Sequence, residues 1–212
     1  MMQQNNKCIL VLAPHTDDGE LGCGGTIARK IEEGWDVYYV AFSICEESVP
    51  PGFPKDALES EVKEATRVLG IQPSNLIVKR YPVRKFNSYR QEILEDLVSL
   101  RTEIRPSHVF MPCREALHQD HKTISEEGLR AFKHFNCFGY DLPWDTIRFS
   151  TSCFFLLEER HVEKKVEALL KYETQNFRNY VDRDFIFGLS RVRGAQIATS
   201  YAEAFEAIRT IF

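Results

Sequence analysis

Apolar residues along this chain follow two alternating spacings, one typical of β-strands and one typical of helices. Short continuous apolar runs, rich in β-branched and aromatic residues, predict strands at residues 8–13, 36–43, 75–78 and 107–111. Between these runs apolar residues recur every three or four positions, which predicts amphipathic helices over residues 20–33, 56–69 and 88–104. Strands that alternate with helices of this length predict an α/β fold, with a mostly parallel sheet covered by helices on both faces.

The pattern is less regular after residue 140. Residues 141–144 predict a turn, residues 147–157 an extended strand or a pair of strands, and residues 160–172 a charged helix. The remaining segment, residues 176–212, gives mixed signals. Because no repeat, low-complexity stretch or linker divides the sequence, we expect a single domain over residues 1–212.

The composition is that of an ordinary water-soluble globular protein, with 43% apolar and 27% charged residues. A net charge of −4 and scattered Lys and Arg residues argue against nucleic acid or an anionic membrane as a partner. No apolar run is long enough to span a bilayer, so we expect no stable membrane insertion. The sequence leaves a homo-oligomer open.

Two features bear on the cellular compartment. Residues 1–7 lack the charged region and the cleavage site of a signal peptide. The six cysteines occur singly, without a C-x-x-C pair or a dense framework, which is typical of a reducing environment. We therefore expect a cytoplasmic protein.

Polar residues that can bind a metal follow two of the predicted strands. The first cluster is His15, Asp17 and Asp18, and the second is His118, Asp120 and His121. A buried apolar strand needs no acid at its end, and open α/β sheets bind their ligands at the carboxyl ends of the strands. Together the two clusters predict a divalent-metal hydrolase.

A catalytic zinc site uses three protein ligands and leaves a fourth position open. His15 and Asp18 are three positions apart in a tight turn, and His121 reaches the same centre from the end of a different strand. We expect these three residues to bind Zn²⁺ or another divalent transition metal. No cysteine spacing matches a closed structural zinc site.

The neighbouring polar residues predict the catalytic groups. Asp17 lies beside a ligand and is expected to take a proton from water as the general base. His118 is expected to stabilise an oxyanion or to protonate a leaving amine. Asp120 is expected to hydrogen-bond an imidazole and to fix its tautomer and orientation.

Two other interpretations of these clusters stay open. Glycines at positions 19, 22, 24 and 25 follow a strand as in a phosphate-binding loop, but their spacing is not G-x-G-x-x-G. Asp17 and Asp18 would also repel a phosphate, and the glycines are equally explained by the turn and by close packing of a helix on the sheet. Either cluster alone is consistent with helix capping and solvent-exposed histidines, whereas both together favour a metal site.

The same residues resemble the two motifs of the PIG-L/LmbE-like N-acetylglucosaminyl deacetylase family. The first motif, His-Pro-Asp-Asp with a following Leu-Gly-Cys-Gly-Gly-Thr, corresponds to residues 15–26, and the second, His-x-Asp-His, to residues 118–121. Weaker matches lie at residues 165–175, 193–194 and 201–205. The resemblance spans about residues 8–207, nearly the whole chain.

The resemblance implies a Rossmann-like fold and zinc-dependent removal of an N-acetyl group from an amino-sugar-containing small molecule or glycoconjugate precursor. It implies the same zinc ligands, with Asp17 as the general base and with His118, supported by Asp120, as the oxyanion-stabilising or acid group. The alternatives are an amidase acting on a sugar–thiol conjugate and a non-catalytic sugar- or nucleotide-binding module.

The sequence departs from the family pattern at three positions. Thr16 replaces the usual proline and Gly19 a bulkier residue, both in the metal-binding turn but not as ligands. Leu58 stands where many members have an arginine, three positions before the helix glutamate that matches Glu61. An arginine there would hold a polar substrate group, so this departure bears on the substrate and not on the reaction.

Overall fold

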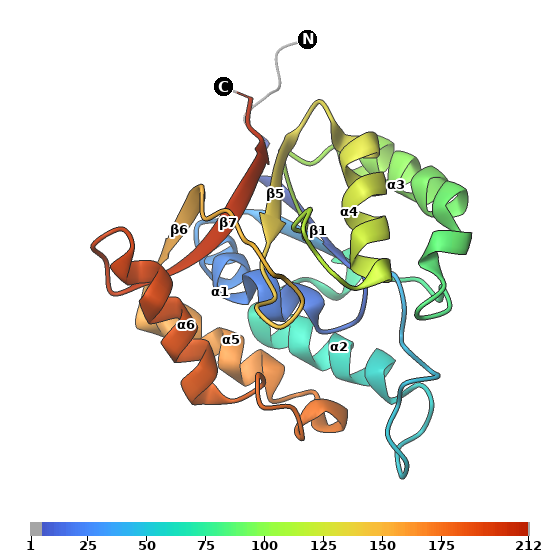
Figure 1. Ribbon diagram of the computed structural model, residues 1–212, viewed down its shortest axis with the longest axis horizontal. Helices are drawn as coiled ribbons and strands as arrows, with labels where there is room; N and C mark the ends of the chain where they lie inside the picture. Colours follow the sequence, from blue (N-terminus) through green and yellow to red (C-terminus); the bar gives the residue numbers. More distant parts are fainter. Residues whose placement is uncertain (1–5, 212) are drawn as a thin grey trace.

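The structure is a computed structural model that describes residues 6–211, shown as a ribbon in Figure 1. The expected lack of a signal peptide in residues 1–7, and the ends of the expected domain over residues 1–212, fall wholly or largely outside the described residues.

Within the described residues the strands form one seven-stranded sheet in the order β3-β2-β1-β4-β5-β7-β6. All neighbours from β3 to β5 are parallel, and β7 runs antiparallel to both β5 and β6. The strands are β1 (Cys8–Ala13), β2 (Asp36–Ala41), β3 (Leu76–Val78), β4 (His108–Pro112), β5 (Asn136–Tyr140), β6 (Cys153–Leu157) and β7 (Tyr201–Arg209). The prediction of a mostly parallel sheet is confirmed.

Six α-helices cover this sheet, in the part of the chain that the structure describes. They are α1 (Asp18–Glu32), α2 (Ala57–Leu69), α3 (Arg90–Ile104), α4 (Gln119–Phe132), α5 (Glu159–Leu169) and α6 (Arg183–Ala195). In Figure 1, α3 and α4 lie on one side of the sheet and the other four helices on the opposite side. The expected Rossmann-like, three-layer α/β/α arrangement is therefore confirmed.

The alternation of side chains along β1 explains the two layers. Ile9, Val11 and Ala13 belong to the core beneath α1, α2, α5 and α6. Leu10 and Leu12 belong to the core beneath α3 and α4. Since successive strand residues point to opposite faces, a strand that is apolar throughout must be covered twice.

Strand order also determines where a ligand can bind. From β1 the chain continues to β2 and β3 on one side, whereas β4 and β5 lie on the other side. The carboxyl ends of β1 and β4 are therefore neighbours at the point where the strand order reverses, which is where open α/β sheets bind ligands.

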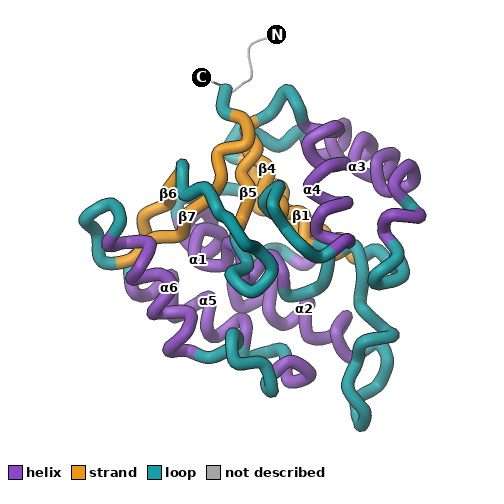
Figure 2. Tube along the Cα trace, in the orientation of Figure 1, coloured by secondary structure: helices purple, strands orange, loops and turns teal. Residues whose placement is uncertain are grey.

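The structure extends the sequence predictions after residue 112. The strand β5, the helix α4 and the pair α6 and β7 were not assigned from the sequence pattern. The extended segment expected at residues 147–157 is a strand only over Cys153–Leu157, and the charged helix ends at Leu169. Figure 2 shows much of the remainder of this region as loops and turns.

The helix α1 is broken into two segments, and a buried ion pair lies at the break. The backbone of Cys23 is not helical (φ −146°, ψ 21°). At this break the Glu203 carboxylate accepts hydrogen bonds from the backbone N–H groups of Gly25 (3.0 Å) and Thr26 (2.7 Å). Lys165 bonds both Glu203 and the Leu21 carbonyl, each at 2.7 Å. The buried charges at the break thereby have partners, which buried charges require.

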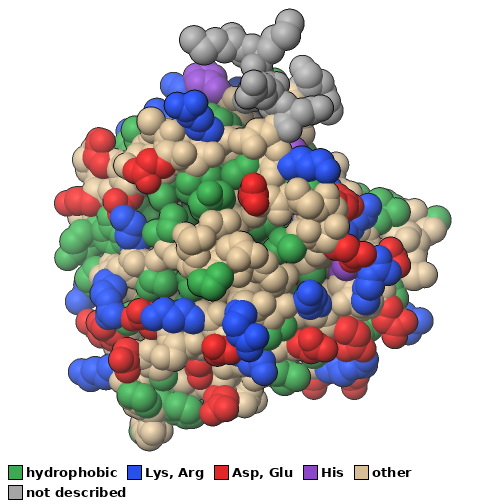
Figure 3. Space-filling view, turned by 180° about the vertical axis from the view of Figure 1, so that it is seen from behind, with side chains coloured by type: hydrophobic (Ala, Val, Ile, Leu, Met, Phe, Trp, Pro, Cys, Tyr) green, Lys and Arg blue, Asp and Glu red, His purple; other side chains and the backbone are tan. Residues whose placement is uncertain are grey.

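Charged side chains on the surface are mixed in sign. On the face shown in Figure 3, Lys and Arg side chains lie among Asp and Glu side chains. Many charged side chains of the described residues form ion pairs, for example Arg160 with Glu32 and Arg183 with Glu163. None of the helices within residues 6–211 is both long and apolar enough to cross a membrane.

Candidate active site

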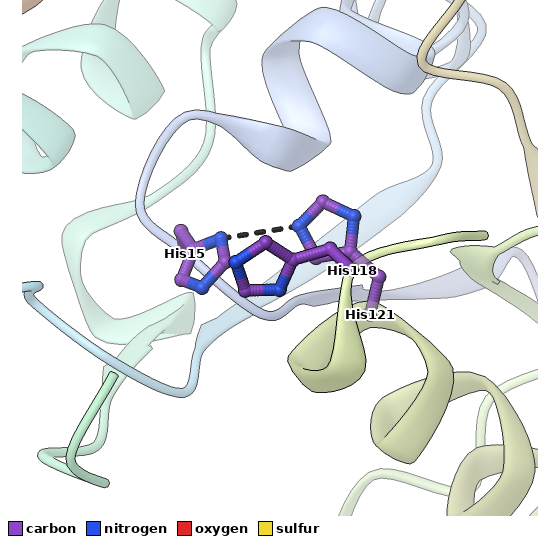
Figure 4. Close-up of side chains that lie close together, drawn as sticks. All are labelled: His15, His118 and His121. Atoms are coloured by element: carbon purple, nitrogen blue, oxygen red, sulfur yellow. Dashed lines mark hydrogen bonds between the residues drawn. The ribbon is translucent and has the colours of Figure 1, made fainter. Parts of the chain in front are cut away.

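The two predicted clusters meet at the carboxyl ends of β1 and β4. His15, Asp17 and Asp18 lie in the turn between β1 and α1, and His118 and His121 lie at the start of α4. All five line one pocket of about 340 Å³. Figure 4 shows the three imidazoles converging from these two segments.

The three expected metal ligands place their donor atoms at one point. Asp18 Oδ2 lies 3.1 Å from His15 Nδ1 and 3.2 Å from His121 Nε2, and these two nitrogens are 3.1 Å apart. Neighbouring ligands of a tetrahedral ion with bonds of about 2.0 Å are about 3.3 Å apart, so the observed triangle has the size that a small dication requires.

Each ligand histidine is oriented by a carboxylate on its other nitrogen. His15 Nε2 lies 3.2 Å from Asp120 Oδ2, and His121 Nδ1 lies 2.6 Å from Asp145 Oδ2. Because a carboxylate accepts hydrogen bonds, the nitrogens that face Asp120 and Asp145 carry protons, which leaves His15 Nδ1 and His121 Nε2 for a metal. Without a metal, the charge of Asp18 outweighs burial and raises the pKa of His15 to about 8 and that of His121 to about 10. A cation would therefore bind by displacing the second proton of each ring, which frees one lone pair on each nitrogen. Two lone pairs and a carboxylate oxygen that face one another fit a cation between them.

His118 differs from the other two histidines. Its Nδ1 accepts a hydrogen bond from the backbone N–H of Asp120 (3.2 Å). The proton of the neutral ring is therefore on Nε2, which makes that nitrogen a donor rather than a ligand. Burial, together with the charges of His15 and His121, lowers the pKa of His118, so the ring stays neutral.

The three imidazoles together also meet the distance requirement for a metal site, since their nearest nitrogens lie within 4.8 Å of one another. The triangle that includes Asp18 is tighter, and each of its three atoms is of a type that coordinates metals. We therefore favour the set with Asp18 and treat His118 as a hydrogen-bond donor.

The two adjacent carboxylates have opposite electrostatic environments. Burial, together with the neighbouring charge of Asp18, raises the pKa of Asp17 to about 6. Burial also acts on Asp18, but the charges of His121 and His15 outweigh it and hold the pKa of Asp18 well below its usual range. Asp18 is therefore a permanent anion, and Asp17 is able to exchange a proton near neutral pH.

Asp120 supports both histidine environments. Its carboxylate contacts His15 and accepts hydrogen bonds from the backbone N–H groups of Arg84 (2.5 Å) and Phe86 (3.2 Å). Its own N–H is the group that bonds His118. The expected support of His118 thus comes from the Asp120 backbone, while its side chain fixes the tautomer of His15.

The structure explains why Thr16 and Gly19 are accommodated in the turn between β1 and α1. A Cβ atom on Gly19 would lie 2.4–2.7 Å from the ring of Tyr39, so the turn packs directly on this aromatic side chain. The carbonyl of Thr16 accepts hydrogen bonds from Tyr39 (2.8 Å) and Tyr172 (2.7 Å), and both hydroxyls also contact the buried Glu20. Two tyrosines thereby hold a turn that lacks the usual proline.

Several pocket residues were not identified from the sequence. Asp145 orients His121 and also accepts a hydrogen bond from the His118 backbone N–H (2.8 Å). The loops after β4 and β5 lie side by side in Figures 1 and 2, joined by a bridge between Ala116 and Thr146. This pairing brings Asp145 to the metal site. The pocket is also lined by Leu58, the departure noted in the sequence, and by Val83, Arg84, Trp144, Gln175, Arg178 and Tyr180.

Comparison with known proteins finds similar sequences and structures. Over 173 residues the chain is 25% identical to a protein of Escherichia coli K12 described as the uncharacterized deacetylase YaiS, covering 79% of this chain and 91% of that protein. The conserved protein TT1542 from Thermus thermophilus has a similar structure, with a TM-score of 0.82, 27% identity, and coverage of 96% of this chain and 95% of that one.

The N,N'-diacetylchitobiose deacetylase from Pyrococcus horikoshii, in complex with an inhibitor, shares the fold at 19% identity. Its TM-score is 0.79, over 95% of this chain and 84% of that one. The sequence profile of the GlcNAc-PI de-N-acetylases matches residues 10–132, more than half of the chain and the stretch that carries both polar clusters. The chain therefore belongs to this family, PIG-L.

Proposed function

We propose that this protein is a metal-dependent hydrolase that removes the N-acetyl group from an amino-sugar-containing small molecule or glycoconjugate precursor. The observation that supports this proposal most directly is the triangle formed by potential ligand atoms of His15, Asp18 and His121. Asp17 and His118 line the same pocket. Membership of the PIG-L family and the deacetylase names of its relatives support the proposal.

The donor set fits Zn²⁺ or another divalent transition metal, because imidazole and carboxylate ligands suit several of these ions. Such an ion, when bound, supplies a Lewis acid for the amide carbonyl and lowers the pKa of water in the site. His15 and His121 are held for this task by Asp120 and Asp145.

Asp17 acts as the general base in this proposal. It takes a proton from the water molecule that attacks the acetyl carbonyl, and its pKa of about 6 leaves it ionised at neutral pH yet basic enough to hold that proton. The same proton then passes to the amine as the carbon–nitrogen bond breaks, which yields acetate and a free amine.

His118 stabilises the charge that develops on the carbonyl oxygen. Its Nε2–H is a preorganised donor, because the Asp120 N–H occupies Nδ1 and the lowered pKa keeps the ring neutral. Preorganised donors of this kind stabilise tetrahedral intermediates by a few kcal/mol, roughly a factor of 10²–10³ in rate.

The test combines metal analysis with product detection. The purified protein, loaded with Zn²⁺, is incubated with N-acetylglucosamine, its phosphates and N,N'-diacetylchitobiose, and acetate and free amine are measured. We expect equal amounts of both products from at least one compound, loss of activity on chelation and recovery on adding metal. Activity that survives complete removal of metal would contradict the proposal, as would no acetate from a broad panel.

A further inference from the structure

Arg178 is an exposed cation at the edge of the pocket, with unused hydrogen-bonding capacity. It lines the same pocket as Asp17, and its charge partly counteracts the rise in the Asp17 pKa. Its Nε donates a hydrogen bond to Gln175 Oε1 at 3.4 Å. Among residues 6–211, no acceptor takes a hydrogen bond from its two terminal nitrogens and no carboxylate forms an ion pair with it.

A chain of hydrogen bonds that starts on α2 positions this arginine. Both oxygens of the Glu61 carboxylate are occupied by Thr174, one by its N–H (2.9 Å) and one by its hydroxyl (2.6 Å). The same hydroxyl accepts a hydrogen bond from Gln175 Nε2 (3.1 Å), which turns Gln175 Oε1 toward Arg178. Since Thr174 and Gln175 are buried, this series of hydrogen bonds is a fixed part of the structure around the pocket.

Aromatic rings hold the guanidinium from the side. Its carbon lies 5.8 Å from the centre of the Tyr180 ring and 4.9 Å from that of Phe177. Tyr180 stacks on Trp144 with ring centres 3.7 Å apart and planes inclined by 11°. Trp144, Tyr180 and Arg178 all line the pocket, so two stacked aromatic rings lie beside the guanidinium.

The other arginine of the pocket is less suited to a ligand. The guanidinium of Arg84 lies 3.9 Å from the Glu47 carboxylate, so its charge already has a partner. Leu58, on the α2 wall, offers no charge. The free positive charge at the pocket wall is therefore that of Arg178, and it is separate from the five residues assigned to catalysis.

We propose that Arg178 is the specificity residue for a phosphate or carboxylate carried by the substrate at a distance from the N-acetyl group. A guanidinium with two free terminal nitrogens matches both anions bidentately. The sugar or other ring between the anion and the amide would lie along the Trp144–Tyr180 wall. This inference rests on the proposed deacetylase function, because it concerns the substrate of the same pocket.

Binding measurements test it independently of turnover. In the Asp17→Asn background, loaded with Zn²⁺, calorimetry compares N-acetylglucosamine with its 1-phosphate, its 6-phosphate and N-acetylmuramic acid, which carries a carboxylate. We expect at least one anionic compound to bind roughly tenfold or more tightly than the neutral sugar. Adding Arg178→Met should remove most of that difference. The compound that shows the preference distinguishes phosphate from carboxylate.

The matched control is Arg67→Met, which removes an arginine of α2 that pairs with Glu64 outside this pocket. It should leave the preference intact. Equal affinity for neutral and anionic sugars would overturn the inference, and so would a preference that survives Arg178→Met but is lost in Arg84→Met. Acetate release by the wild-type protein tests the deacetylase function separately, so the two failures are distinguishable.

Discussion

The two sides of the pocket are built in different ways. The side proposed to bind metal, called the metal-binding side below, carries the expected ligands His15, Asp18 and His121 together with His118. These residues lie at the ends of parallel strands and in the first turns of helices. The opposite wall, with Trp144, Arg178 and Tyr180, comes from segments without regular secondary structure after β5 and before α6. The first side is fixed by the sheet, whereas the second is held by side-chain contacts and by the hydrogen bonds that run from Glu61 on α2.

We infer from this difference that one side of the pocket carries out the reaction and that the other side selects the substrate. Groups that must share one metal ion need positions accurate to a fraction of an ångström, which strand ends and helix starts provide. Loops tolerate sequence change more easily and carry recognition in many enzymes. Variants on the metal-binding side should therefore alter turnover or metal affinity, and variants in the loop wall should alter substrate affinity.

The largest expected effect is that of Asp17→Asn. The amide cannot take a proton from water, so kcat for acetate release should fall by about 10²–10⁴-fold while the metal content is unchanged. Elemental analysis and an acetate assay measure both quantities, with Asp184→Asn on the exposed side of α6 as the control. A variant with more than a tenth of the normal kcat would show that Asp17 is not the base.

Asp145→Asn tests whether a loop residue belongs to the metal-binding side. An amide nitrogen facing His121 Nδ1 favours the tautomer that places the proton on Nε2, where the metal should bind. Metal affinity, measured by competition with a chelator, should fall about 10–100-fold. Asp141→Asn, in the same loop but paired with Arg193, serves as the control. Unchanged affinity in Asp145→Asn would remove this residue from the metal site.

Trp144→Ala tests the loop wall. Loss of the stack on Tyr180 removes part of the flat surface, so KM should rise about 3–10-fold while kcat changes by less than about twofold. Steady-state kinetics with the best substrate of the panel separates the two parameters. A large fall in kcat with an unchanged KM would mean that the wall takes part in the chemistry and that the two sides do not differ.

The smallest effect is expected at the other end of β4. Burial and the nearby Lys30 lower the pKa of His108 to about 4, well below the value near 6.5 of an unfolded chain. Between these two values the unfolded state binds more protons, so folding stability falls as the pH decreases.

His108→Phe keeps the packing against Phe138 and Trp35 but removes this titration. The loss of stability between pH 7 and pH 4.5, measured by urea unfolding, should be smaller in the variant by at most about 1–2 kcal/mol, since His108 is partly exposed. Activity at neutral pH should not change. An identical pH dependence in variant and wild type would contradict the assignment.

The fold was predictable where the hydrophobic pattern was unambiguous. The first four assigned strands are largely apolar, and Gly34 and Gly70 follow their helices with positive φ angles. The strand β7 was not predicted from the sequence because Glu203 and Glu206 interrupt its apolar pattern. Both are buried, but Glu203 is paired with Lys165 and Glu206 with Arg114, partners that only the tertiary structure provides.

The same reasoning applies to the candidate site. Six polar residues after two apolar strands were recognisable because their position at strand ends has no structural need for acids or imidazoles. Asp145, Gln175 and Arg178 gave no such signal, since an acid, an amide or an arginine in a loop is ordinary. Only Asp182, whose side chain caps α6, offered an overlooked local cue for an element of that region.

The Glu203 carboxylate has a consequence for the order in which the protein is made. It caps the second segment of α1 across 177 positions of sequence. During synthesis α1 leaves the ribosome long before its cap, and until β7 joins the sheet the Gly25 and Thr26 amides and the Lys165 ammonium lack their partner. We therefore expect the second segment of α1 to become fully ordered only after β7 has joined the sheet.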